Sequence, residues 1–143
     1  MSVQVAINEQ WSSGRTGSVQ CGLRKLGAGE EVLVWPVDHP FVESETVIRL
    51  RETLRTDPLG VWFIPTYEGR GGHPVALKRE AVVRVLELDP ATPLRAVLPA
   101  LEPRVIRIPV DDPGIVANID TPKEYDRYYR QWQDRRKELW TVD

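Results

Sequence analysis

One continuous apolar run, residues 32–37, most constrains what this chain can fold into. A run of this length without polar alternation is typical of a strand buried on both faces of a parallel sheet that helices cover. Asp38 follows the run, between Pro36 and Pro40, and would lie at the strand's carboxyl end. Ligands bind at that edge of open α/β sheets, and a carboxylate there can hold Mg²⁺ against a phosphate-bearing substrate. The alternative is that Asp38 simply caps the helix that follows.

The composition fits one globular domain spanning residues 1–143, with 41% hydrophobic residues to form its core. Nineteen basic and 21 acidic residues give a net charge of -2 without a long block of one sign, which argues against a nucleic-acid surface. One cysteine, Cys21, cannot form an internal disulfide, and two histidines offer little for a zinc site. We therefore expect a cytoplasmic protein, and no apolar stretch approaches the roughly 20 residues of a membrane span.

Strand and helix patterns alternate along the chain, which predicts an α/β fold. A short strand over residues 3–7 precedes a loop rich in Gly and Ser, and a helix over 19–26 opens after Ser18 as its cap. The last helix has the sharpest signal, because Thr121 and Glu124 fit a capping box with Pro122 at the first helical position. The other predicted elements are helices over 43–55, 78–88 and 92–101, and strands over 61–65, 75–77 and 105–110, the last near a sheet edge.

Two further segments carry side chains that could do chemistry. Asn118 and Asp120 point to one side of an extended segment, because residues two apart share a face, and they could complete a Mg²⁺ shell with Asp38. Their alternative role is to satisfy the backbone before the last helix. A glycine turn ends in Gly72-His73-Pro74, and its histidine is either a site residue or a structural turn residue.

Taken in order, these segments resemble the MobA-like nucleotidyltransferase family, and within it the molybdenum-cofactor cytidylyltransferase type. The resemblance spans residues 3–130 and rests on a strand and Asn-x-x-Trp-x-x-Gly loop (8–14), V-D-H-P (37–40), G-R-G-G-H-P (69–74) and N-I-D-T-P-K-E-Y (118–125). It implies a three-layer αβα fold with a Rossmann-like, mostly parallel sheet. It also implies Mg²⁺-dependent transfer of a nucleoside monophosphate from CTP or another NTP to a phosphate- or pterin-type acceptor, with release of pyrophosphate.

The resemblance assigns roles to particular positions. Asp38 would bind Mg²⁺, with Asn118 and Asp120 on the metal and substrate side. The loop with Gly14, Thr16 and Ser18 would approach the nucleotide. The turn with Arg70, Gly72 and His73 would lie by the acceptor pocket.

The chain departs from the family at its start. Family members begin with a strand and a Gly-rich loop, L-A-A-G-x-S-x-R-M-G-x-x-K, that holds the triphosphate, and no such segment occurs here. The expected fold is therefore N-terminally truncated, with unpaired strand edges that favour association. We expect the chain to pair with another copy, to pair with a separate N-terminal fragment, or to rearrange residues 3–7 against the Val32 strand. A second functional hypothesis is a non-catalytic remnant or subunit that binds a nucleotide or a partner protein.

Overall fold

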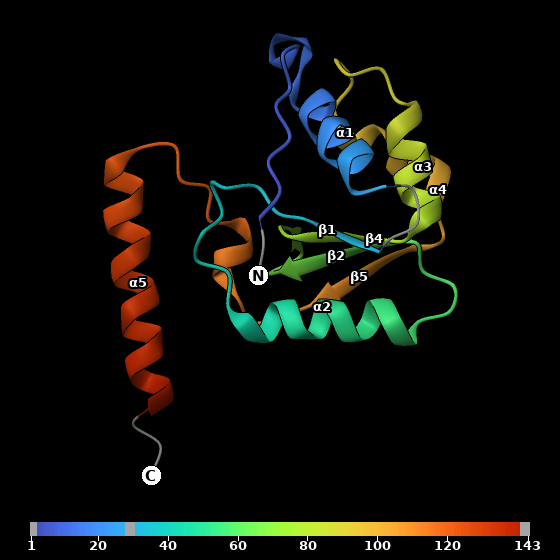
Figure 1. Cartoon of the computed structure of the whole chain (residues 1–143). Coiled ribbons are helices and arrows are strands. Elements are labelled where there is room, and N and C mark those ends of the chain that lie inside the picture. The colour runs from blue at the N-terminus through green and yellow to red at the C-terminus, as the bar shows by residue number, and fades with distance from the viewer. Residues whose placement is uncertain (1–2, 28–30, 141–143) are drawn as a thin grey trace.

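The computed structural model describes residues 3–27 and 31–140, in which helices cover both faces of a central sheet (Figure 1). Helix α2 lies on one face, and α1, α3 and α4 lie on the other. This arrangement confirms the predicted α/β class with three layers. The helices are α1 (Arg15–Leu26), α2 (Ser44–Thr56), α3 (Arg79–Glu87), α4 (Leu98–Leu101) and α5 (Pro122–Trp140), with short 3-10 helices η1 (Trp11–Ser13), η2 (Leu94–Val97) and η3 (Pro113–Val116).

The sheet is mixed rather than mostly parallel. Its strands are β1 (Val32–Val34), β2 (Trp62–Tyr67), β3 (Arg70–Gly71), β4 (Val75–Leu77) and β5 (Val105–Pro109). Only the β2–β5 pair is parallel among the pairs of the described chain, because β4 turns back after β3 and inserts antiparallel between β1 and β2. Since β4 is antiparallel to both neighbours, β1, β2 and β5 run the same way and their carboxyl ends share one sheet edge.

Two apolar clusters, one on each face of the sheet, form the core. Neighbouring residues of β2 point to opposite faces, so Trp62 joins the cluster with α1 and α3, whereas Phe63 joins the one with α2. On the second face, Leu50 and Leu54 of α2 cover Phe63, as the predicted helical spacing requires. The central strands β2 and β4 are therefore buried on both faces.

The prediction that the Val32 run is buried on both faces is wrong beyond its first residue. Val32 is buried, but Leu33 and Trp35 are exposed and Val37 is 97% exposed. Within the described part of the chain β1 pairs with β4 alone, so it is an edge strand, and it ends at Val34. Helix α2 packs on β2 and β4 and leaves the second face of β1 uncovered.

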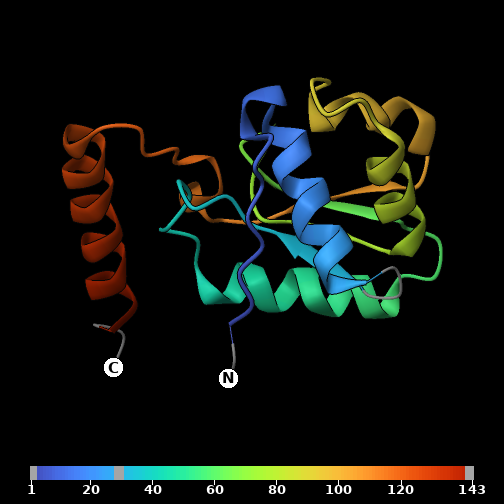
Figure 2. The ribbon, with the colours of Figure 1, turned by 45° about the horizontal axis from the view of Figure 1, so that its top comes forward.

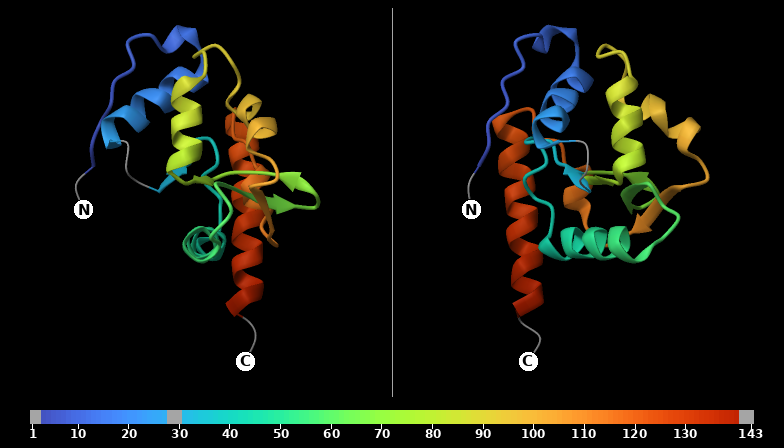
Figure 3. Two further views of the ribbon diagram at one scale, coloured as in Figure 1. Left: turned by 90° about the vertical axis from the view of Figure 1, so that its right-hand side faces the viewer. Right: turned by 45° about the vertical axis from the view of Figure 1, so that its right-hand side comes forward.

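Residues 3–7 do not form the predicted strand. Val3, Val5 and Ile7 are between 75% and 82% exposed, and the segment pairs with no described strand. It runs along the outside of α1, away from the strands (Figures 2 and 3). The alternating apolar pattern is present, but the segment's one hydrogen bond among the described residues runs from Cys21 Sγ to the Ile7 carbonyl (3.5 Å), and its apolar side chains stay exposed. Of the three alternatives given for the strand edges, the rearrangement of this segment against β1 does not occur.

Helix α1 begins at Arg15, not after Ser18 as predicted. Gly14, with φ +133°, precedes the first turn, and the buried polar side chains of the helix bond to the end of α3 and to the turn that follows it. Thr16 Oγ1 donates to the carbonyl of Thr92 (2.6 Å), and Gln20 Nε2 donates to the carbonyls of Val85 and Leu88 (2.8 Å each). These tertiary hydrogen bonds stabilise α1 around Gly17, although a glycine inside a helix is locally unfavourable.

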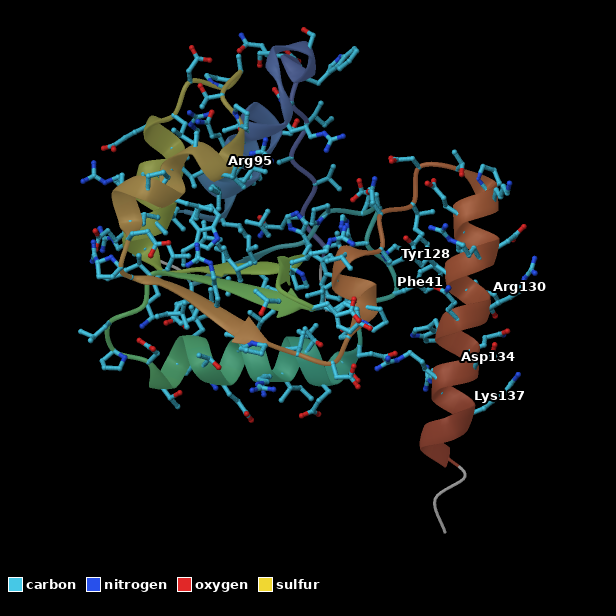
Figure 4. All side chains as sticks on the ribbon, turned by 180° about the vertical axis from the view of Figure 1, so that it is seen from behind. Phe41, Arg95, Tyr128, Arg130, Asp134 and Lys137 are labelled. Carbon is cyan, nitrogen blue, oxygen red and sulfur yellow. The ribbon has the colours of Figure 1, made fainter. Side chains whose placement is uncertain are left out.

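Helix α5 begins as predicted and stands at the side of the sheet. The Thr121 hydroxyl accepts from the Glu124 N–H (3.2 Å) and donates to the Glu124 carboxylate (2.9 Å), which confirms the capping interaction. Phe41 packs against an aromatic face of α5, while Arg130, Asp134 and Lys137 point away from the sheet (Figure 4). Among the described residues, no helix is both long and apolar enough to cross a bilayer.

One buried carboxylate joins the start of α2 to η3. Asp112 is 2% exposed, and its Oδ2 accepts from the backbone N–H of Glu43 (2.9 Å) and the hydroxyl of Thr46 (2.7 Å). Its Oδ1 accepts from the N–H of Gly114 (2.8 Å). Asp112 thus caps η3 and anchors the start of α2 from a distant part of the chain. The N-cap position of α2 is held by Glu43, so Asp38 is not the cap of that helix.

We predict that Asp112→Ala lowers the free energy of unfolding by about 3 kcal/mol, because it leaves buried donors without an acceptor. The matched control is Asp111→Ala, which removes a side chain that is 89% exposed and should cost less than about 1 kcal/mol. Urea denaturation followed by circular dichroism measures both. Equal losses for the two variants would contradict this role for Asp112.

Candidate functional site

Three loops meet at the edge where β1, β2 and β5 end. They are residues 35–40 after β1, residues 68–74 between β2 and β4, which include β3, and residues 110–121 after β5, which include η3. The N–H of Ile119 donates to the carbonyl of Asp38 (2.9 Å), and the N–H of His73 donates to the carbonyl of Ile115 (2.9 Å). The loop after β5 therefore holds the other two in place, as expected for strands whose carboxyl ends share an edge.

Asp38 presents an ionised carboxylate in this site. Its Oδ1 lies 2.9 Å from Nδ1 of His39, and its side chain is partly buried. Burial acts to raise the pKa of the Asp38 carboxyl, but the hydrogen bond and charge of His39 outweigh it, with help from Arg15. The pKa is therefore lower than usual, and the group is a carboxylate at neutral pH.

His73 lies next to His39 and is neutral. The two rings meet edge to face, with centroids 4.9 Å apart. Burial lowers the pKa of His73, and His39 lowers it further, although Asp38 opposes the shift. Nδ1 of His73 is buried and has no hydrogen-bond partner in the described residues. An orphan nitrogen of this kind is able to bond a ligand.

Gly72 allows the histidine turn to approach η3. A Cβ placed on Gly72 would collide with the backbone carbonyl of Ile115, which is the group that accepts from His73. Because backbone cannot move aside as a flexible side chain does, glycine is required for this contact. The roles of Gly72 and His73 in the site are therefore linked by packing.

The 118–120 segment is joined to Asp38 through the backbone. Ile119, between Asn118 and Asp120, makes the hydrogen bond to Asp38, and Asn118 Nδ2 donates to Asp120 Oδ2 (2.5 Å). That bond shows that the two side chains share a face. Neither side chain bonds to the backbone before α5, since the Asp120 N–H is bound by the carboxylate of Glu124 (3.0 Å). The side-chain oxygen of Asn118 faces no described donor.

The predicted nucleotide residues lie in the cap and first turn of α1. Gly14 contacts the turn at Pro90, Thr16 is buried with its hydroxyl bound to Thr92, and the Ser18 hydroxyl accepts from Asn8 Nδ2 (3.1 Å). Thr16 therefore anchors this turn rather than facing solvent. Arg15, between Gly14 and Thr16, is exposed and close enough to lower the pKa of Asp38.

Arg70 lies on the exposed hairpin of β2 and β3. It faces Tyr67 in the strand register, and none of the hydrogen bonds, ion pairs or ring contacts of the described chain joins it to Asp38 or His73. The structure brings Asp38, His73 and the 118–120 segment together, but leaves Arg70 outside this cluster.

A family model for the MobA-like NTP transferase domain matches residues 1–105, most of the chain. This chain belongs to that family. The comparison with curated proteins finds no match. The fold is similar to the crystal structure of molybdopterin-guanine dinucleotide biosynthesis protein A from Archaeoglobus fulgidus, with a TM-score of 0.59 and 20% identity over 80% of this chain. This MobA-like chain spans 60% of the length of that neighbour.

The oxygen donors of the MobA-like site fit Mg²⁺ together with a phosphate ligand, but not a closed protein cage. No three His, Cys, Asp or Glu residues of the described chain are placed to hold a metal ion together. Asp38 has one carboxylate oxygen beyond the His39 bond, and the backbone of the 118–120 segment, which carries Asn118 and Asp120, is bonded to the Asp38 carbonyl. Mg²⁺ is usually bound in this way, through one or two carboxylates plus substrate phosphates and water.

Sequence reasoning overlooked residues that shape this MobA-like site. His39 adjoins the predicted metal ligand, and its imidazole could have been recognised as a partner for a carboxylate. Arg15 lies inside the predicted nucleotide loop as its one basic residue. Asp112 had a local signal, because Asp before Pro and Gly is typical of a cap with proline at the first helical position.

A separate groove of about 690 Å³ lies between α5 and the start of α2, and includes neither Asp38 nor His73 in its lining. Arg49, Arg135 and Arg136 line it beside Glu43, Glu45 and Asp111. Because basic and acidic groups alternate there, the groove favours no one charge of ligand.

We predict that Gly72→Ala destabilises the MobA-like domain by about 2 kcal/mol, as expected for a group forced into a packed contact. Gly22→Ala is the control, because nothing lies within 4 Å of its new Cβ. In the middle of α1 that change should stabilise the fold by about 0.5–1 kcal/mol. Thermal unfolding of the two variants checks the opposite signs.

Proposed function

We propose that this chain takes part in Mg²⁺-dependent nucleotidyl transfer from CTP or another NTP to a phosphate- or pterin-type acceptor. The observation that carries the proposal is the ionised Asp38 at the common carboxyl edge of three strands, fixed to the 118–120 segment by the Ile119 hydrogen bond. Membership in the NTP transferase family supports a nucleotide as substrate. The name of the archaeal neighbour, which refers to molybdopterin-guanine dinucleotide, supports a pterin-type acceptor.

The reaction requires positioning and charge neutralisation rather than a covalent nucleophile. A phosphate oxygen of the acceptor forms a bond to the α-phosphorus, the bond from that phosphorus to the bridging oxygen breaks, and pyrophosphate leaves. Mg²⁺, when bound, neutralises phosphate charge, and Asp38 with Asn118 or Asp120 would hold it. The task of the chain is to orient these ligands.

The remaining site residues have roles that follow from where they lie. Gly14 has no side chain to cap α1, and the exposed Arg15 adds positive charge at this end of the helix, whereas Thr16 and Gly17 of the first turn are buried. We assign this turn, with Ser18, to the nucleotide, and Thr16 to holding it in place. Neutral His73, positioned by Gly72, would bond the acceptor through its orphan nitrogen. Arg70 would contact the acceptor from the hairpin.

A second candidate is a non-catalytic subunit that binds a nucleotide or a partner protein. The exposed edge of β1 and the uncovered Val3, Val5 and Ile7 favour it, because both features suit an added strand. We propose that another copy of the chain or a separate N-terminal fragment covers this edge. The single unpaired cysteine, Cys21, supports a cytoplasmic location.

We predict that the purified chain binds CTP or another of the four NTPs in the presence of Mg²⁺, and that Asp38→Ala weakens binding at least about 10-fold, as loss of a metal ligand or its support does. Isothermal titration calorimetry with CTP, GTP, ATP and UTP measures this. Asp126→Ala, on the exposed side of α5, should bind as the wild type does. Absence of binding by the wild type would favour a remnant, or a chain that needs its partner.

We also predict association at the β1 edge. Light scattering should give a mass above the 16.3 kDa of one chain, and Leu33→Lys should lower it, because charge on an edge strand opposes pairing. Leu59→Lys, at an exposed leucine after α2, should leave the mass unchanged. If the wild type is a stable, compact monomer, pairing with another copy is ruled out. If its mass is also unchanged when a separate N-terminal fragment is added, the second form of pairing is ruled out as well.

A further inference from the structure

We propose that His39 is the positioning residue of the Asp38 carboxylate: it holds one oxygen so that the other faces the metal and phosphate. This inference rests on the proposed function and deepens it. The contact that carries it is the 2.9 Å separation between His39 Nδ1 and Asp38 Oδ1. Asp38 is the proposed metal ligand, and His39 acts only through it.

The chemistry of the pair fixes the direction of the hydrogen bond. An ionised carboxylate can only accept, so Nδ1 of His39 carries a proton and donates. With Oδ1 occupied, the carboxylate cannot rotate freely and Oδ2 becomes the oxygen left for a ligand. A group that orients a metal ligand in this way commonly governs metal affinity, even though it does not touch the metal.

The surroundings of His39 keep its ring in one place. The His39 N–H donates to the carbonyl of Pro36 (3.2 Å), and the indole N–H of Trp35 donates to the His39 carbonyl (2.8 Å). The ring is largely buried, with 12% of the side chain exposed, and the edge-to-face contact with His73 bounds one side. Backbone and ring are thus fixed before any ligand arrives, which lets the imidazole impose a geometry on Asp38.

The same contacts link the two halves of the proposed site. The backbone of His73 bonds to η3, and the ring of His73 contacts the ring of His39. His39 in turn contacts Asp38. The turn assigned to the acceptor and the carboxylate assigned to the metal therefore share one imidazole. A displacement of the glycine turn would be transmitted to Asp38 through this ring.

Two substitutions separate positioning from packing. His39→Leu keeps a side chain of similar bulk against His73 but removes the donor. His39→Asn is smaller, yet its amide nitrogen can occupy the place of Nδ1 and donate to Asp38. If His39 merely fills space, leucine is the better replacement; if it positions Asp38, asparagine is.

The test is the affinity of the whole chain for Mn²⁺ in the presence of saturating CTP, measured by electron paramagnetic resonance of free Mn²⁺, without turnover. We expect His39→Leu to weaken Mn²⁺ binding about 10- to 100-fold and His39→Asn to restore most of it. Circular dichroism confirms that both variants fold. If His39→Leu does not fold, His39→Gln replaces it as the variant that lacks the donor at the position of Nδ1, because its longer amide should not restore binding.

Each outcome decides a different point. Wild-type affinity in His39→Leu, or better binding by the leucine than by the asparagine variant, overturns the positioning role and leaves the proposed function intact. Failure of the wild type itself to bind Mn²⁺ with CTP overturns the metal site, and the role of His39 with it. Loss in the leucine variant and recovery in the asparagine variant establish the inference.

Discussion

The geometry of the site depends on the buried carboxylate of Asp112. Its oxygens accept from Glu43, Thr46 and Gly114, so that one side chain fixes both the start of α2 and the turn of η3. Burying a carboxyl group without partners is costly, and here three hydrogen bonds offset that cost. Because η3 in turn offers the Ile115 carbonyl to His73, the position of the histidine turn follows from a residue outside the site.

Elements with strong local signals could be predicted from the sequence. Helix α2 was expected over 43–55 and runs from Ser44 to Thr56, and α5 begins at Pro122 with the expected capping interaction. The meeting of Asp38 with the 118–120 segment was also predictable in outline, because both follow strands whose carboxyl ends share an edge. These features follow from residues close in sequence or from a general rule of sheet topology.

What could not be predicted depends on neighbours that a local pattern does not contain. The direction of β4 made the sheet mixed, and no pattern in residues 75–77 distinguishes parallel from antiparallel pairing. The early start of α1 comes from Thr16 and Gln20 bonding to residues about 65 to 76 positions away. An alternating apolar segment such as residues 3–7 forms a strand only beside a partner, and the exposure of Val5 shows that the described part of the chain supplies none.

The energetics of the exposed edge indicate what a partner would have to do. Burying Val3, Val5 and Ile7 would gain about 1.5–3 kcal/mol for each side chain at most, whereas association costs an estimated 4–15 kcal/mol. Apolar contact with this segment alone therefore leaves little net affinity. A stable partner must also bond to the edge of β1 and cover Leu33, which is paired with the buried Ala76 of β4. A strand placed there in parallel with β1 would end at the edge that carries Asp38, so that the partner which completes the sheet would also contribute to the site.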